Sequence, residues 1–237
     1  MAAPTPRIVV HWLDDSRAQR VLWLLEELGL EYEVQRYHRD AATNLGPPEL
    51  RKIHPLGKSP VVTITEGDRT TTLAESGAIV EFLIERYGKG KLAITAEADL
   101  EARSNYLYWL HYAEGSAMLP LMFNIVFAQI PKQAPWLVRP IVSQISAGAM
   151  QQFILPRLKS HFGFLEQSLE GKDFLVGNKL TGADIMCSFL AEGLAASPLK
   201  QEDYPNVKRW HAALEAREAY KAAEVKGGKN DLTRFVK

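Results

Sequence analysis

Residues 54–76 read HPLGKSPVVTITEGDRTTTLAES, and this stretch organises the first third of the chain. Residues 61–65 and 70–73 alternate on either side of the turn at residues 66–68 (EGD), which is typical of a β-hairpin. Apolar side chains then recur at helical spacing before Gly88, at Ile79, Val80, Leu83 and Tyr87. The stretch therefore predicts two antiparallel strands followed by a helix.

The sequence before this hairpin predicts a strand, a helix and a second strand. Residues 7–13 (RIVVHWL) form a short apolar run rich in β-branched side chains, which indicates a buried strand. Residues 18–28 place their apolar side chains on one helical face, and Gly29 suits a left-handed helix end. Residues 32–36 predict the next strand. A strand–helix–strand unit of this length implies a parallel pair of strands joined by a right-handed crossover.

Strand signals stop at about residue 99, and the rest of the chain predicts helices. We expect helices over residues 101–118, 141–169, 181–194 and 207–220, with a break at residues 131–140 and a kink near Pro156. Residues 181–184 (TGAD) fit a capping box in which Asp replaces Glu. The prediction is an α/β domain over residues 1–90, with βαβ and then ββα order, followed by an all-helical domain over residues 98–237.

Composition excludes several classes of protein. The chain has 237 residues and a formal net charge of zero, so nothing indicates a nucleic-acid-binding surface. The apolar run at residues 118–128 is too short to span a bilayer, and we expect no signal peptide because residues 1–6 contain no apolar core of the kind that such peptides carry. The single cysteine, Cys187, excludes internal disulfides and paired-thiol redox chemistry, and its apolar helix predicts a buried side chain. We expect a cytoplasmic protein.

Four motifs in order make the chain similar to the cytosolic glutathione transferases, and most of all to those of fungi. They are HPLGKSP at residues 54–60, LAES at residues 73–76, LTGAD at residues 180–184, and YPNV at residues 204–207 with Trp210. The resemblance implies a thioredoxin-like N-terminal domain with a C-terminal helical bundle domain. It also implies a homodimer that uses glutathione as co-substrate. The six histidines show no ligand spacing, so we predict no metal.

The resemblance also implies a glutathione-binding site in the HPLGKSP and LAES motifs. Ser76, at a helix N-terminus, would hold the γ-glutamyl carboxylate, and Glu75 would accept from the γ-glutamyl ammonium. Ser59 would offer its backbone to the cysteinyl part, beside a cis Pro60, and Lys58 would bind a carboxylate. The alternative is that Ser76 and Glu75 only cap a helix and that Lys58 is an exposed loop residue.

Ser16 is the predicted catalytic residue. In the family a hydroxyl or thiol at the start of the first helix addresses the glutathione sulfur, and Ser16 is the only hydroxyl in that loop. A donor to the thiolate favours its ionised form. Counting back from Arg20, however, the family's serine position aligns with Asp15, so the Ser16 backbone N–H remains an alternative donor. Ser16 with Gln19 also fits a capping box, which would be a purely structural role.

Other residues suggest where a second substrate binds. Trp12, Tyr108, Tyr112, Met118 and Phe123 are candidates for an apolar acceptor pocket, although aromatic stripes are more often core. Residues 119–145, read as an apolar inter-helix connection, could roof that pocket, form a dimer contact or touch a membrane. His38 and Arg39 are candidates for the glycyl carboxylate.

The resemblance implies a transferase that conjugates the glutathione thiolate to small apolar electrophiles. The same thiolate would also allow a glutathione-dependent peroxidase activity. The alternative is a non-enzymatic ligand carrier or protein-interaction module on the same fold, which the Asp15 anomaly favours. The sequence leaves the role open between detoxification, peroxide handling and carriage.

Overall fold

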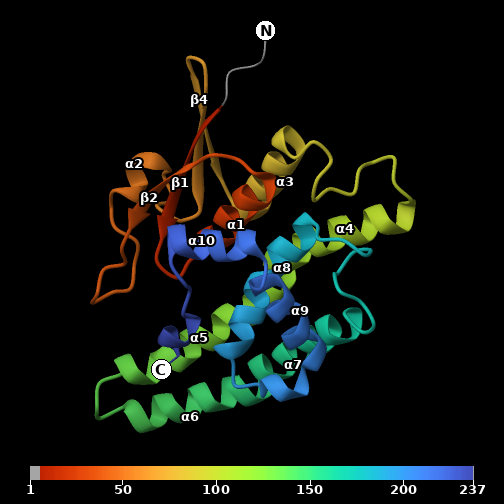
Figure 1. Cartoon of the computed structure of the whole chain (residues 1–237). Helices are drawn as coiled ribbons and strands as arrows, with labels where there is room; N and C mark the ends of the chain where they lie inside the picture. Colours follow the sequence, from red (N-terminus) through yellow and green to blue (C-terminus); the bar gives the residue numbers. More distant parts are fainter. Residues whose placement is uncertain (1–5, 237) are drawn as a thin grey trace.

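A computed structural model describes residues 6–236, and a four-stranded sheet forms its first part (Figure 1). The strands are β1 (Arg7–Leu13), β2 (Glu33–Tyr37), β3 (Val61–Glu66) and β4 (Arg69–Ala74), in the order β2-β1-β3-β4. β1 and β2 are parallel, whereas β3 is antiparallel to both β1 and β4. The predicted hairpin and the predicted parallel pair are both confirmed.

Helices cover both sides of this sheet (Figure 1). The helices α1 (Ala18–Leu28) and α3 (Ser76–Tyr87) pack on one side, and the short α2 (Leu50–Ile53) lies on the other. The apolar face of α1 is buried because its side chains fill the space between the sheet and the helices behind it. This is the βαβ and ββα order that the sequence predicts, and the fold class is confirmed.

Two long helices form an antiparallel hairpin in the second part. α4 (Leu100–Tyr112) continues through a π-helical turn, η1 (Ala113–Ala117), into α5 (Met118–Gln133). α6 (Arg139–Ala149) likewise continues through η2 (Met150–Ile154) into α7 (Leu155–Ser168). The prediction that residues 119–145 are a connection was wrong, because only residues 134–138 lie between helices. Pro131 lies inside α5 two residues before its end, where it lacks the N–H that would bond the carbonyl four residues earlier, but little helix follows it.

The continuous helix Leu100–Gln133 is the single helix among residues 6–236 long and apolar enough to cross a membrane by length and composition. Its most apolar 18-residue window has a mean hydropathy of 1.2, and 33% of that window is buried within this chain. Core helices of globular domains meet the same criterion, and α4 packs along α8 (Gly182–Ala195). The sequence prediction considered only residues 118–128 and missed the full length of this helix.

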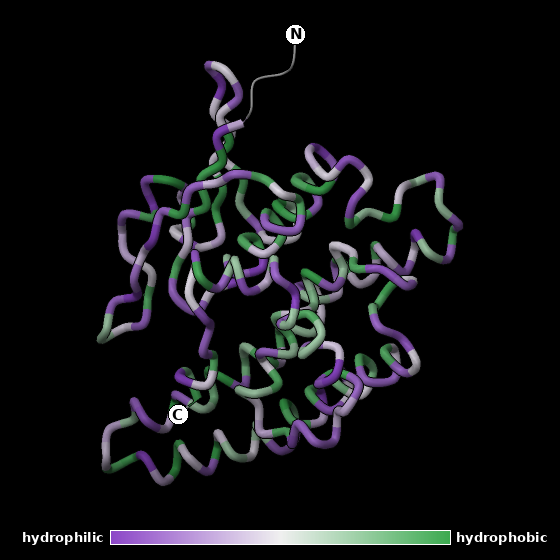
Figure 2. The backbone as a smooth tube through the Cα atoms, in the orientation of Figure 1, coloured by the Kyte–Doolittle hydropathy of each residue, from purple (hydrophilic) through white to green (hydrophobic). Residues whose placement is uncertain are grey.

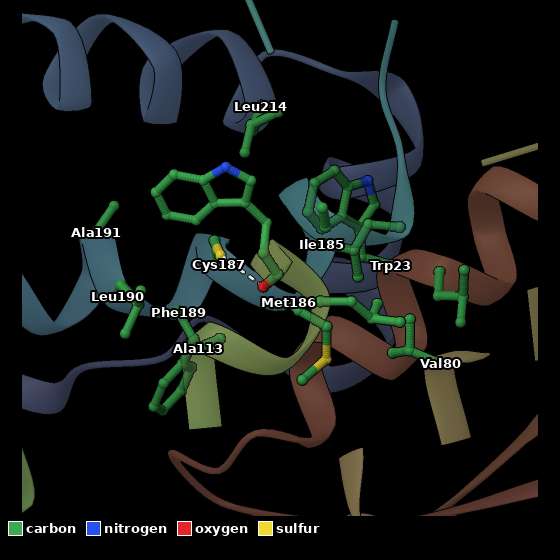
Figure 3. Packing of buried hydrophobic residues seen from close by; sticks show 14 of the residues in the cluster. Trp23, Val80, Ala113, Ile185, Met186, Cys187, Phe189, Leu190, Ala191 and Leu214 are labelled. Atoms are coloured by element: carbon green, nitrogen blue, oxygen red, sulfur yellow. Dashed lines mark hydrogen bonds between the residues drawn. The ribbon is translucent and has the colours of Figure 1, made fainter. Parts of the chain in front are cut away.

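The helix α8 lies at the centre of the molecule and is buried along almost its whole length. Its predicted capping box is present, since Asp184 accepts from the backbone N–H of Thr181 at 2.9 Å. Asp184 also accepts from the Trp210 indole at 3.1 Å. Figure 3 shows Cys187 among apolar side chains, where its thiol donates to the Trp109 carbonyl oxygen at 3.4 Å. Burial raises the pKa of Cys187, which confirms a buried and inert side chain.

The C-terminal helices return to the sheet part. The predicted last helix, residues 207–220, is two helices, α9 (Pro205–Glu215) and α10 (Glu218–Gly227), and α10 packs against α1. A Cβ at Gly227 would clash with Leu22 of α1, so the close approach of the two helices requires glycine there. Two short helical turns, η3 (Gln201–Asp203) and η4 (Leu232–Phe235), complete the chain. Figure 2 shows hydrophobic residues following the helix contacts and hydrophilic residues in the outer loops.

Candidate active site

Two adjoining cavities lie where the sheet part meets the helices. The first, here the motif pocket, has a volume of about 100 Å³ and is lined by residues of the HPLGKSP and LAES motifs. The second, here the apolar pocket, has a volume of about 180 Å³ and lies against α5, α8 and η4. Ser59 and Arg17 line both cavities, so these two residues mark the place where the cavities meet.

All four predicted glutathione-binding residues, Lys58, Ser59, Glu75 and Ser76, line the motif pocket. The sheet brings the two motifs together, because Val61 at the start of β3 pairs with Ala74 at the end of β4. The Ser59–Pro60 peptide bond is cis, as the resemblance implied.

Three polar side chains of the motif pocket, those of Lys58, Glu75 and Ser76, lack protein partners. Glu75, with φ of 70°, precedes α3, and Ser76 is the first residue of that helix. Among residues 6–236, no hydrogen bond or ion pair engages the side chains of Lys58, Glu75 or Ser76. An α-helix N-terminus also carries free backbone N–H groups and a partial positive charge. The pocket therefore offers a cation, an anion, a hydroxyl and a helix end to one ligand.

Ser16 lies in the apolar pocket beside Ser59, and its side chain is 6% exposed. Its Oγ accepts from the backbone N–H of Ala18 at 3.2 Å and lies 3.4 Å from the Oγ of Ser59. The Ser59 hydroxyl donates its own proton to the His11 carbonyl oxygen at 2.8 Å. Because that proton is committed, the Ser16 hydroxyl is the one of the two that can donate into the cavity.

The predicted capping box between Ser16 and Gln19 is wrong. α1 begins at Ala18, and its N-cap, Arg17, makes no side-chain capping bond. The Gln19 amide oxygen instead accepts from the Trp12 indole at 3.2 Å, because Trp12 and Gln19 are both buried under α10.

Asp15 turns away from the motif pocket and holds the C-terminal segment. Its carboxylate accepts from the backbone N–H of Asp231 at 2.8 Å and from the Arg234 guanidinium at 2.7 Å. Asp15 has a φ of 47°, and this left-handed conformation turns the chain between β1 and α1. The anomaly in the sequence thus has a structural role, and the Asp15 carboxylate is held by the C-terminal segment and not by the neighbouring Ser16 hydroxyl.

The apolar pocket differs from the predicted one. Of the five residues proposed from the sequence, Met118 lines it, whereas Trp12, Tyr108, Tyr112 and Phe123 do not. Tyr112 instead lies 2.6 Å from the His161 ring nitrogen, within an aromatic cluster on the far side of α4. The apolar lining comes from α5, α8 and the C-terminal segment: Met118, Leu121, Met122, Ile125, Phe189, Leu232 and Phe235.

His38 and Arg39 do not reach the motif pocket. The His38 ring lies 3.1 Å from the Asp14 carboxylate, and Arg39 lines the apolar pocket. The prediction that they contact a ligand carboxylate held by the motif pocket therefore has no support in the geometry.

One carboxylate that sequence reasoning missed, Glu114, joins the two parts of the molecule. Glu114 lies in the π-helical turn η1 and pairs with Arg17 and Arg20 of the sheet part, each at 2.9 Å. Burial lowers the pKa of Arg20, and the Glu114 charge opposes that effect. No sequence signal indicated Glu114, because its partners lie about a hundred residues away.

No group of three or more His, Cys, Asp or Glu side chains within residues 6–236 is arranged to hold a metal ion.

Comparisons with known proteins agree with this geometry. Residues 6–85 match the glutathione S-transferase N-terminal domain, and residues 130–218 match the glutathione S-transferase C-terminal domain. The chain is 36% identical to glutathione S-transferase 1 of Saccharomyces cerevisiae, over 93% of this chain and 95% of the relative. It is 32% identical to glutathione S-transferase 3 of Schizosaccharomyces pombe, over 96% of this chain and 91% of the relative.

Two solved structures extend the comparison. A glutathione S-transferase from Actinobacillus pleuropneumoniae is 33% identical, with a TM-score of 0.74 over 96% of this chain and 95% of the other. A glutathione transferase from Phanerochaete chrysosporium, solved with oxidized glutathione, shares the fold at 21% identity, with a TM-score of 0.69 over 94% of each chain. The motifs, the fold and the paired cavities all agree with these matches, and the chain belongs to the glutathione S-transferase family.

Proposed function

We propose that this transferase conjugates the glutathione thiolate to small apolar electrophiles. The observation that carries the proposal is the convergence of the unpartnered side chains of Lys58, Glu75 and Ser76 on one pocket, which opens beside Ser16 onto an apolar cavity. Unpaired polar groups that face a cavity are satisfied when a ligand supplies the missing partners.

Glutathione fits the motif pocket group by group. Its γ-glutamyl carboxylate would lie at the α3 N-terminus against Ser76, and its ammonium would donate to Glu75. The backbone of Ser59 would pair with the cysteinyl unit, and Lys58 would take a carboxylate. This placement directs the sulfur toward the junction of the two cavities, where Ser16 and Ser59 lie side by side.

The chemical step needs a thiolate. A free thiol titrates near 8.5, so at neutral pH it is mostly protonated. The Ser16 hydroxyl would donate to the sulfur and favour the ionised form, and the thiol proton would pass to solvent. The thiolate then attacks an electrophilic carbon, a C–S bond forms, and the leaving group departs with its electron pair. Holding both reactants in adjoining cavities lowers the activation barrier, because the entropy of bringing them together is lost on binding and not in the chemical step.

A peroxidase activity would use the same thiolate. Attack on an organic hydroperoxide breaks the O–O bond and gives an alcohol and the sulfenic acid of glutathione. A second glutathione then reduces that sulfenic acid, with release of glutathione disulfide and water. The apolar lining of the second pocket suits an apolar hydroperoxide as well as it suits an electrophile.

Calorimetric titration with glutathione, followed by a chloronitrobenzene conjugation assay, tests the proposal. Glu75→Gln and Ser76→Ala should each abolish retention on immobilised glutathione, whereas Glu85→Gln, on the exposed side of the same helix, should not. Binding without turnover would favour the alternative, a non-enzymatic ligand carrier. Full retention by both pocket variants would overturn the glutathione site.

A homodimer is the oligomeric state that we propose, because the α5–α6 hairpin exposes a large apolar face. The face is formed by Leu119, Met122, Val126, Ile130, Trp136, Leu137, Ile141 and Ile145, which are 41% to 79% exposed. Figure 2 shows hydrophobic residues on both helices of this hairpin. Exposed apolar side chains that gather on one helical hairpin favour an interaction site there.

Sedimentation equilibrium tests the dimer. Trp136→Ser combined with Ile141→Ser should yield a monomer, and Val225→Ser, an 82%-exposed apolar residue on α10, should not. A wild-type monomer that binds phospholipid vesicles would instead assign the face to a membrane surface.

A further inference from the structure

The apolar pocket contains three charged residues, Asp15, Arg17 and Arg39. A charge that lines an apolar cavity needs a partner, because removing it from water is costly. Asp15 has one in Arg234 at 2.7 Å, and Arg17 has one in Glu114 at 2.9 Å. Their charges are therefore balanced within the protein.

Arg39 is held differently, by backbone carbonyl oxygens. Its Nε donates to Asp14 at 2.9 Å, its Nη1 to Asn44 at 2.9 Å, and its Nη2 to Asp15 at 3.4 Å. Within residues 6–236, this guanidinium forms no ion pair with a carboxylate. The nearby Asp14 carboxylate is engaged by the His38 ring and by the Arg39 backbone N–H.

The Arg39 guanidinium is thus held in place by the backbone, carries a charge and keeps N–H donors without a protein acceptor. It carries five N–H donors, and three are engaged, which leaves one on each Nη nitrogen. Burial lowers the pKa of Arg39, and the nearby Asp15 and Asp14 charges oppose that effect. The guanidinium keeps its proton at neutral pH. The Phe235 ring also lines the pocket, and its centroid lies 5.4 Å from the Arg39 guanidinium carbon, in a cation–π contact.

We propose that the acceptor substrate of this enzyme is an apolar electrophile that carries a carboxylate, with Arg39 as the counter-ion. The apolar body would lie against α5, α8 and η4, and the carboxylate would accept from the two remaining N–H groups. This inference rests on the proposed function, because it treats the apolar pocket as the acceptor site.

Two matched acceptors test the inference: 4-chloro-3-nitrobenzoate and its methyl ester. Both react with thiolate at the same carbon and release chloride, so each kcat/KM is divided by the rate constant of the uncatalysed reaction with glutathione. We expect the wild type to prefer the carboxylate about tenfold, which corresponds to about 1.4 kcal/mol. Arg39→Gln should abolish the preference, Arg39→Lys should keep part of it, and Arg69→Gln should keep all of it.

Arg69 is the matched control because it is exposed at the start of β4 and its loss changes the net charge by the same amount. An equal preference in the wild type and in Arg39→Gln would overturn the inference. A raised KM for glutathione in Arg39→Gln, with the acceptor preference unchanged, would overturn it too, since Arg39 would then hold the glycyl carboxylate.

A binding measurement separates this inference from the proposed function. Calorimetry with 4-phenylbutanoate and 4-phenylbutan-1-ol compares a carboxylate with an alcohol on the same apolar body and needs no turnover. Tighter binding of the carboxylate, lost in Arg39→Gln, would support the inference even if neither acceptor were conjugated. Conjugation of both acceptors with no carboxylate preference in either assay would leave the transferase in place and overturn the role of Arg39.

Discussion

Ser16→Ala is the most direct test of how the enzyme ionises glutathione. The Ser16 hydroxyl is the donor available at the junction of the two pockets, because the Ser59 proton is committed to the His11 carbonyl oxygen. A hydrogen bond to a charged group contributes about 1.5–3 kcal/mol. At about 1.4 kcal/mol per pKa unit, its loss should raise the pKa of the bound thiol by roughly one to two units.

The effect on rate is smaller than the effect on ionisation. Well below the thiol pKa, the thiolate fraction falls about tenfold per unit, but a more basic thiolate is also a better nucleophile, with a Brønsted slope of about 0.4–0.5. At pH 6.5 the expected fall in kcat/KM is therefore about 3- to 16-fold. Above both thiol pKa values, the variant should equal or exceed the wild type.

The assay is the pH profile of kcat/KM for conjugation, read together with the KM for glutathione. Ser59→Ala is the matched control, because its hydroxyl donates to the protein backbone, and its profile should move by less than half of the Ser16→Ala shift. Ser16→Ala also removes an acceptor for the Ala18 N–H, which should lower stability by about 1 kcal/mol. An unchanged pH midpoint in Ser16→Ala would refute the reasoning and assign the thiolate to a backbone donor.

Three further predictions concern the surrounding structure. Asp15→Ala removes two of the hydrogen bonds that hold the C-terminal segment, so amide hydrogen exchange at residues 231–236, followed by mass spectrometry, should quicken while the unfolding temperature changes little. Burial raises the pKa of Glu192 to about 7, so the folded state holds a proton that the unfolded chain releases near pH 4.5; stability should fall from pH 4.5 to pH 7, by at most roughly 3 kcal/mol, and Glu192→Gln should flatten that slope in urea titrations. Asp184→Ala leaves buried donors of Leu175, Thr181 and Trp210 without an acceptor, and urea unfolding should show a loss of roughly 3 kcal/mol.

The parts of the fold that sequence predicted are local. The hairpin at residues 61–74 and the capping box at Thr181 and Asp184 each depend on residues a few positions apart, whose spacing is visible in the sequence. The prediction at residues 119–145 failed for a related reason. Pro131 favours a break because it removes one backbone hydrogen bond, but most of the stability of a helix comes from tertiary packing, which the sequence does not show.

The candidate site divides in the same way. Lys58, Ser59, Glu75 and Ser76 lie within two short motifs joined by one hairpin, so their order in the sequence placed them in one pocket. The apolar pocket could not be predicted, because its walls come from α5, α8 and the C-terminal segment, and four of the five residues chosen for it pack elsewhere. The spacing of aromatic residues on a helix does not show whether they face a cavity or the core.

The sequence by itself determined the order of strands and helices, the family and the motif pocket, because periodicity, turn residues and short motifs are encoded locally. Tertiary structure alone decided that the Ser16 hydroxyl, and not that of Ser59, can donate to a ligand, and which charged side chains of the apolar pocket have ion-pair partners. Asp15 is engaged by Asp231 and Arg234, more than two hundred residues away, and Arg39 lacks a carboxylate partner only because the fold directs the nearby ones elsewhere. Charge balance in a pocket depends on distances between remote side chains, which exist only once the chain has folded.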